Sequence, residues 1–159
     1  MKAQAFLEQL ETLDTIIGNK LAEREHWRSI ALGITGSTEG ERVQSSGSQQ
    51  KMADAIDRYV DIGKEIDETI DRLTDKKLEV IRLLDKLAFV NRRHYDILHK
   101  MYVGHVVTKP DGTFATIRMD FTDYANLYGK SYSWATTVHG RALQNFQRIL
   151  DAEYPASCD

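Results

Sequence analysis

The sequence predicts a mainly α-helical protein, in which a long antiparallel helical hairpin of coiled-coil type precedes a C-terminal helix-turn-helix with a small β-hairpin insertion. Three patterns indicate this class: an apolar stripe at helical spacing over residues 3–32, a heptad pattern over 52–90, and the turn, cap and core offsets of a helix-turn-helix over 121–150. The expected regions are a helical hairpin over 1–90, a second domain over 91–150 and a tail over 151–159.

The first expected helix carries its apolar residues three and four positions apart, with charged residues between them. This stripe consists of Phe6, Leu10, Leu13, Ile17 and Leu21. After residue 32 the composition changes to Gly, Ser and Thr with few large apolar groups. Such a composition is typical of a flexible linker, which we place at about 33–51.

The second expected helix covers residues 52–90, and its apolar seam alternates steps of four and three over five heptads. The seam comprises Met52, Ile56, Tyr59, Gly63, Ile66, Ile70, Leu73, Lys77, Val80, Leu84 and Leu87. A helix of this length cannot bury its stripe on itself, so we expect the first helix to fold back along it. Because two helices form a thin core, we also expect a homo-oligomer in which a second copy completes a bundle.

A β-hairpin is expected after a short helix over residues 94–103. The Pro-Asp-Gly sequence at 110–112 supplies the turn, and β-branched and aromatic residues flank it. Two interpretations of this insertion stay open. It is either an inert surface feature or a wing that contacts phosphate through Lys109 and Arg118.

Two helices, over 121–128 and 131–150, are expected to form the helix-turn-helix. This motif needs a small residue where the helices cross, a turn residue that tolerates positive φ, an N-cap, and buried residues early in the second helix. The residues at these offsets are Ala125, Gly129, Ser131, Ala135 and Val138, in that order.

The outward positions at the start of the second helix are mostly small or hydrogen-bonding, which suits insertion into the major groove of DNA. The predicted DNA-binding residues are Lys130, Tyr132, Ser133, Thr136, Thr137 and Arg141. The charge distribution agrees with double-stranded DNA as the partner, because residues 91–150 hold 8 Lys and Arg against 4 Asp and Glu, while residues 1–90 hold 13 against 17.

Three strings of this sequence together resemble region four of bacterial sigma factors: Met-Tyr-Val at 101–103, Asp-Tyr-Ala-Asn-Leu-Tyr-Gly-Lys-Ser at 123–131 and Val-His-Gly-Arg-Ala-Leu at 138–143. Over nearly its full length the chain more closely resembles a family of small phage and prophage proteins of Gram-positive bacteria, some of them regulators of late transcription. The string Glu-Arg-Val-Gln-Ser-Ser at 41–46 and the long second helix belong to that resemblance. It implies a transcription regulator that binds promoter DNA, with RNA polymerase as a further partner.

Two other classes stay open. A small-terminase-like DNA-packaging protein also joins a helix-turn-helix to a coiled coil, and a coiled-coil adaptor that binds protein would fit the scarcity of arginine in the recognition helix. Ring-sized oligomers would favour the DNA-packaging protein, and failure to bind any DNA would favour the adaptor.

No enzymatic activity is expected, because the sequence lacks a Gly-rich phosphate loop, a nucleophile elbow and a zincin pattern. We also expect no metal or other cofactor. Among the candidates His94, His99 and His105, the first two lie five positions apart and point in different directions on one helix, and Cys158 is the only cysteine. A single cysteine and the absence of a long apolar run predict a protein of the bacterial cytoplasm without a membrane span.

Overall fold

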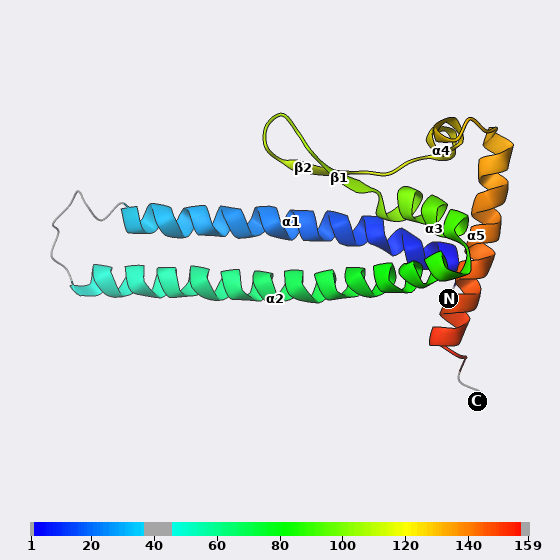
Figure 1. Cartoon of the computed structure of the whole chain (residues 1–159). Helices are drawn as coiled ribbons and strands as arrows, with labels where there is room; N and C mark the ends of the chain where they lie inside the picture. Colours follow the sequence, from blue (N-terminus) through cyan, green and yellow to red (C-terminus); the bar gives the residue numbers. More distant parts are fainter. Residues whose placement is uncertain (1, 37–45, 157–159) are drawn as a thin grey trace. The chain divides into compact units, whose positions relative to one another are not determined.

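The computed structural model describes residues 2–36 and 46–156, and this part of the chain is mainly helical with one two-stranded antiparallel sheet (Figure 1). The predicted mainly α class and the small β-hairpin are therefore confirmed. The elements are α1 (Ala3–Gly36), α2 (Ser46–Val90), α3 (Arg92–Leu98), the π-helix η2 (His99–Val103), β1 (His105–Thr108), β2 (Phe114–Ile117), α4 (Phe121–Leu127) and α5 (Tyr132–Glu153). None of the helices in the described ranges is long and apolar enough to cross a membrane.

The chain divides into two compact units, which we describe separately. The hairpin unit is Leu13–Asp75, and the core unit combines Met1–Thr12 with Lys76–Asp159. Both α1 and α2 begin in one unit and end in the other.

In the hairpin unit, α1 and α2 run antiparallel and side by side. The ring centroids of Trp27 and Tyr59 lie 5.2 Å apart, and the Arg24 guanidinium donates to the Asp67 carboxylate at 3.1 Å. Both contacts join the two helices directly. Because the charged pair is exposed, we expect it to contribute at most about 1 kcal/mol to stability.

The predicted stripe on α1 is wrong at Leu21, whose side chain is 38% exposed. Lys20 and Arg24, which continue the three- and four-residue steps from Ile17, are half-buried instead. The helical period moves the seam away from Leu21, since Leu21 lies about 80° around the helix from the buried Leu13, whereas Lys20 and Arg24 lie within about 20° of it. Long basic side chains can bury their aliphatic stems while the charged ends stay in water, which allows both residues to be half-buried at this seam.

The predicted linker over 33–51 is shorter than the composition indicated. Helix α1 continues through Gly36, and α2 begins at Ser46, so both ends of the predicted range are helical. Residues 37–45 lie outside the described residues.

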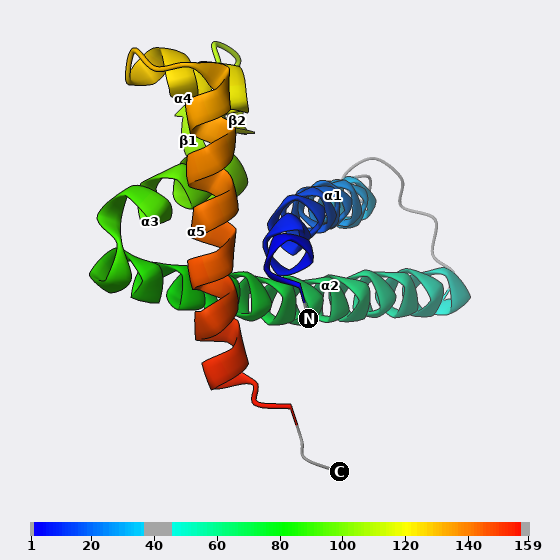
Figure 2. The ribbon, with the colours of Figure 1, turned by 90° about the vertical axis from the view of Figure 1, so that its right-hand side faces the viewer.

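The core unit is organised around α5, which lies across α3 with α4 near its first turns (Figure 2). Phe146 on α5 is fully buried, and its ring centroid lies 6.1 Å from that of Phe6 on α1. The backbone N–H of Ala3 also donates to Oε1 of Gln147 at 2.7 Å. The first turns of α1 thus close the core of this unit against α5.

The same core takes branched aliphatic side chains from α2 and α3. They are Val80, Leu83, Leu84, Leu87, Ile97 and Leu98. The last turn of α5 is joined to α2 at the surface, where Glu153 accepts from Lys86 at 2.6 Å and from Arg82 at 3.1 Å. Side chains of α1, α2, α3 and α5 therefore share one apolar interior.

The short helix predicted over 94–103 begins at Arg92, after Asn91 caps it by accepting from the His94 N–H at 3.1 Å. From His99 onward the helix widens into η2, a π-helical turn that the apolar spacing did not indicate. Wide turns of this kind occur mostly as single turns at the ends of or within α-helices.

The β-hairpin follows η2, and its strands pair in the register His105 to Ile117 through Thr108 to Phe114. Gly112 has a φ of 83° in the predicted Pro-Asp-Gly turn. The base of the hairpin is fixed to η2, because the Met119 N–H donates to the Lys100 carbonyl at 3.0 Å.

Gly104 joins η2 to β1 with a φ of 70° and a ψ of −159°, a backbone region that is almost exclusive to glycine. A Cβ at this position would lie 2.3 Å from the Ile117 carbonyl oxygen. The hairpin base therefore admits no side chain at residue 104.

We predict that Gly104→Ala lowers the free energy of unfolding by at least about 1–3 kcal/mol, because strain at φ is added to a backbone clash. The matched control is Gly140→Ala on α5, where an added Cβ meets no atom within 4 Å. That change should be neutral or stabilise by up to about 1 kcal/mol. Urea unfolding of both variants measures the difference, and equal stabilities would contradict the assigned strain.

Candidate nucleic-acid interface

The connection between α4 and α5 is held by a series of backbone and capping hydrogen bonds. Asp120 begins α4 with a capping box, accepting from the Asp123 N–H at 2.7 Å while the Asp123 carboxylate accepts from the Asp120 N–H at 3.3 Å. After α4, Gly129 adopts a φ of 62°, and the Lys130 N–H donates to the Ala125 carbonyl at 2.9 Å.

Helix α5 begins where Ser131 accepts from the Trp134 N–H at 3.1 Å. The predicted turn at Gly129 and the predicted cap at Ser131 are both confirmed. The predicted small buried residues are also confirmed, since Ala125 is 3% exposed and Ala135 is fully buried. These features fix where α5 starts relative to α4.

The prediction that Val138 is the second buried residue of α5 is wrong, because Val138 is half-buried and His139 is buried. The buried stripe of α5 consists of Ala135, His139, Ala142, Phe146 and Leu150. Its steps of four, three, four and four follow the helical period from Ala135. Val138 lies about 100° around the helix from His139, at the edge of this stripe.

His139 is enclosed by aromatic side chains. Its Nε2 is hydrogen-bonded to the Tyr102 hydroxyl at 2.9 Å, and the Phe121 ring meets it edge-on at a centroid distance of 5.0 Å. Burial lowers the pKa of His139 below its ordinary value of 6.5. Burial also raises the pKa of Tyr102 to about 12, with a further contribution from the negative charge of Glu8. Both groups are therefore neutral at physiological pH.

Five of the six predicted DNA-binding residues are exposed. They are Lys130, Tyr132, Ser133, Thr137 and Arg141. The Tyr132 ring is 58% exposed and rests edge-on against Phe121 at 5.7 Å. It therefore projects from the first turn of α5 at a fixed angle.

The expectation that Thr136 is exposed is wrong, because its side chain is half-buried. Its hydroxyl donates to the Ser133 carbonyl at 2.9 Å, and the Thr137 hydroxyl donates to the same carbonyl at 2.8 Å. Thr136 is half-buried because it lies about 60° around the helix from the buried His139, at the edge of the buried stripe. Thr137, one position further, points to solvent.

The exposed side of α5 forms one continuous stripe, which we call the outer stripe. It consists of Ser133, Thr137, Gly140, Arg141, Gln144 and Arg148. No Asp or Glu occurs between residues 131 and 150. A ligand that approaches the outer stripe therefore meets small or polar groups at its start, two arginines further on, and no carboxylate on this helix.

A cation–aromatic cluster next to the start of α5 was not predicted as a unit. The Arg93 guanidinium lies 4.3 Å from the centroid of the Tyr128 ring and 5.6 Å from that of Trp134. Tyr124 stacks on Trp134 at 5.9 Å. Sequence spacing indicates no such contact, because Arg93 and Trp134 come from helices far apart in the chain.

Of the two basic residues of the possible wing, Arg118 has a structural role, because its Nε donates to the Tyr102 carbonyl at 2.7 Å. Lys109 is exposed beside the turn of the hairpin. The hairpin thus presents one exposed lysine at its tip, while the guanidinium at its base contacts η2.

Comparisons of the chain with protein-family models, with curated proteins and with solved structures found no match. Three features characterise the site. They are the fixed turn between α4 and α5, the carboxylate-free outer stripe, and the arginine held against two aromatic rings.

We predict that the protein loses stability as the pH falls from about 7.5 to about 5, because His139 takes up a proton less readily in the folded than in the unfolded chain. His94 and His99, whose pKa values burial also lowers, act in the same direction. The stability contributed by these neutral histidines is fully present above the pKa that histidine has in the unfolded chain. It is lost as the pH falls below that value.

The pH dependence should become shallower in His139→Gln, as measured by thermal melting across this pH range. The control is His105→Gln, at an exposed position, which should keep the wild-type slope. An unchanged slope in the His139 variant would contradict the assignment.

Proposed function

We propose that the protein is a sequence-specific binder of double-stranded DNA, in which α4 and α5 act as a helix-turn-helix and α5 is the recognition helix. The observation that carries this proposal is the outer stripe: small and hydrogen-bonding at its start, free of carboxylates, and on a helix whose start is fixed by Gly129 and Ser131. A recognition helix needs these properties because its first turns enter the major groove of DNA.

The first four residues of the outer stripe have matching roles. Ser133 and Thr137 offer hydroxyl groups for base edges, and Gly140 lets the helix approach closely because it carries no side chain. Arg141 is suited to a guanine edge or a phosphate. Lys130 and Tyr132, at the start of the helix, lie where flanking phosphates would pass.

The resemblance to region four of sigma factors supports promoter DNA as the target and a phage or prophage transcription regulator as the biological class. On this proposal the protein works in the bacterial cytoplasm and contacts RNA polymerase while bound to DNA. The second candidate is a DNA-packaging protein of the small-terminase type, which the exposed apolar residues of the hairpin unit favour because such proteins assemble into rings.

The low burial of apolar residues in the hairpin unit supports the proposal that the chain self-associates. Of its described side chains only Leu13 and Ile66 are buried, although its helices carry a long apolar seam. Leu21 is 38% and Val60 47% exposed. We propose that a second copy of the chain covers these residues, which would complete a coiled-coil bundle.

The recognition helix is tested by comparing stability with DNA affinity in the same variants. Thr137→Ala should leave the melting temperature nearly unchanged while it weakens specific binding by about 1–3 kcal/mol, if its hydroxyl contacts a base edge. Ala135→Asp should instead unfold the core unit, because an unpaired charge in a fully buried site costs several kcal/mol.

The target for this test is the DNA selected by the protein from a random-sequence pool, and a scrambled duplex measures non-specific binding. Affinity of Thr137→Ala for the scrambled duplex should be unchanged. Equal losses on both duplexes would show that Thr137 does not read bases, and absence of any DNA binding by the wild type would refute the proposed function.

Self-association is tested at exposed positions, so that folding of the hairpin unit is preserved. Leu21→Glu combined with Val60→Glu should lower the mass measured by light scattering, since the charges would be buried in an interface between copies. The control pair, Glu23→Gln with Asp61→Asn, changes charge at exposed polar positions and should keep the mass. A wild-type protein that is monomeric at micromolar concentration would contradict the proposal.

A further inference from the structure

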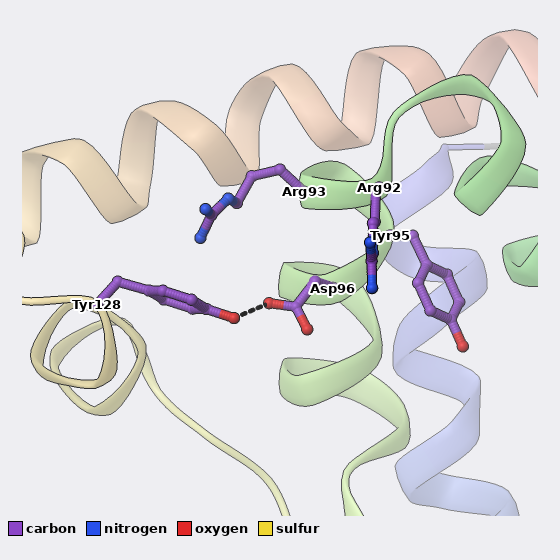
Figure 3. A pocket seen from close by; sticks show the side chains of 5 residues that line it. All are labelled: Arg92, Arg93, Tyr95, Asp96 and Tyr128. Carbon is purple, nitrogen blue, oxygen red and sulfur yellow. Dashed lines mark hydrogen bonds between the residues drawn. The ribbon is translucent and has the colours of Figure 1, made fainter.

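An open cavity of about 620 Å³ lies beside the turn between α4 and α5. It is lined by Arg92, Arg93, Tyr95, Asp96 and Tyr128. Figure 3 shows Asp96 in the middle, with Arg93 and Tyr128 to one side and Arg92 and Tyr95 to the other. Two guanidinium groups from the start of α3 therefore border one space on the surface of the core unit.

The Arg93 guanidinium is held in place before any ligand arrives. It lies 4.3 Å from the Tyr128 ring centroid and 5.6 Å from that of Trp134, so two aromatic faces support it. A guanidinium carries five N–H donors, so Arg93 keeps donors for a ligand beside its contacts with these rings. The planar fork of arginine matches the oxygens of a phosphate, and a fixed side chain loses less entropy on binding.

Asp96 is the one carboxylate among the residues that line the cavity, and its charge is compensated inside the protein. It accepts from the Tyr124 hydroxyl at 2.8 Å and the Tyr128 hydroxyl at 2.5 Å, and it pairs with Lys100. Burial by itself would raise the pKa of Asp96, but hydrogen bonds from Lys100, Tyr128 and Tyr124 outweigh it and hold the pKa below its usual range. Within the described residues, the ion pair of Asp96 is thus with Lys100 and not with Arg92 or Arg93.

The cavity continues the surface that carries the outer stripe. His94, next to Arg93, is hydrogen-bonded through Nδ1 to the Asn145 side chain of α5 at 2.8 Å. The positive charge of Arg141 contributes, after burial, to the lowered pKa of His94. Trp134, which borders Arg93, follows Ser133 directly in the first turn of α5. On the proposed mode of binding, a DNA duplex on the start of α5 would therefore pass close to Arg93.

We propose that Arg92 and Arg93 bind a phosphodiester group of the DNA strand that flanks the start of α5. This inference rests on the proposed function and assigns the phosphate-positioning site of the same interface. Phosphate contacts fix the register of a recognition helix, while base contacts supply the sequence preference. An acidic side chain of a protein partner is disfavoured, because the cavity adjoins the outer stripe.

The test uses the full-length chain and two readouts. The first is the salt dependence of binding to a fluorescein-labelled, scrambled DNA duplex, measured by anisotropy. Arg92→Gln combined with Arg93→Gln should reduce the slope of log affinity against log salt by about 0.9, the loss expected for one phosphate contact, and each single change should give part of this loss. Arg72→Gln, an exposed arginine of the hairpin unit, is the matched control and should keep the wild-type slope.

The second readout is the emission of Trp134, which lies against Arg93. The chain has two tryptophans, so Trp27→Phe leaves Trp134 as the single reporter. Addition of duplex should change its emission, and the change should shrink in the double variant with Arg93→Gln. Circular dichroism checks that each variant keeps its helical content.

Three results would overturn the inference in distinguishable ways. If the wild type binds DNA but both arginine variants keep its slope and Trp134 does not respond, the cavity does not hold a phosphate, and DNA binding through α5 stands. If Trp134 responds to poly-glutamate and not to duplex, the cavity binds an acidic protein segment instead. If the wild type binds no duplex at any salt concentration, the proposed function fails together with this site.

Discussion

The burial of one stripe of α5 is the constraint on which the core unit depends. Ala135, His139, Ala142, Phe146 and Leu150 enter an interior shared with α1, α2 and α3. Each large apolar side chain that is fully buried contributes about 1.5–3 kcal/mol, so rotation of α5 about its axis would cost several such contributions. Because the inner face is fixed in this way, the outer stripe is fixed as well, and its small and basic residues face solvent.

Polar groups within this interior are paired, which keeps the packing of α5 specific. Every buried side-chain nitrogen or oxygen in the described part of the chain has a hydrogen-bond partner. His139 is hydrogen-bonded to the Tyr102 hydroxyl, and the Asp96 carboxylate accepts hydrogen bonds from the hydroxyls of Tyr124 and Tyr128. An unpaired group would cost about 1–3 kcal/mol, so these pairs discriminate against displaced arrangements of α3, α4 and α5. Next to these pairs, Arg93 lies against the rings of Tyr128 and Trp134, beside the proposed recognition face.

The hairpin unit contrasts with the core unit in how completely it buries its apolar residues. Its seam contains Lys20 and Arg24 on α1, and most of its large apolar side chains remain partly accessible. Two helices enclose little volume, so a pair of this kind gains stability from a further helical layer. The chain therefore combines a well-packed unit that carries the proposed DNA site with a less buried unit for which we propose self-association.

The sequence by itself determined the helical class, the β-hairpin with its Pro-Asp-Gly turn, and the local geometry at Gly129 and Ser131. Periodicity, turn chemistry and capping act over a few residues, so they can be identified without knowing the tertiary structure. Only the tertiary structure decided that His139 and not Val138 is buried, and that Thr136 turns inward. It also brought Arg93 to Tyr128 and Trp134. These outcomes depend on the angle at which α5 crosses α3 and on side chains far apart in the chain, which no local pattern encodes.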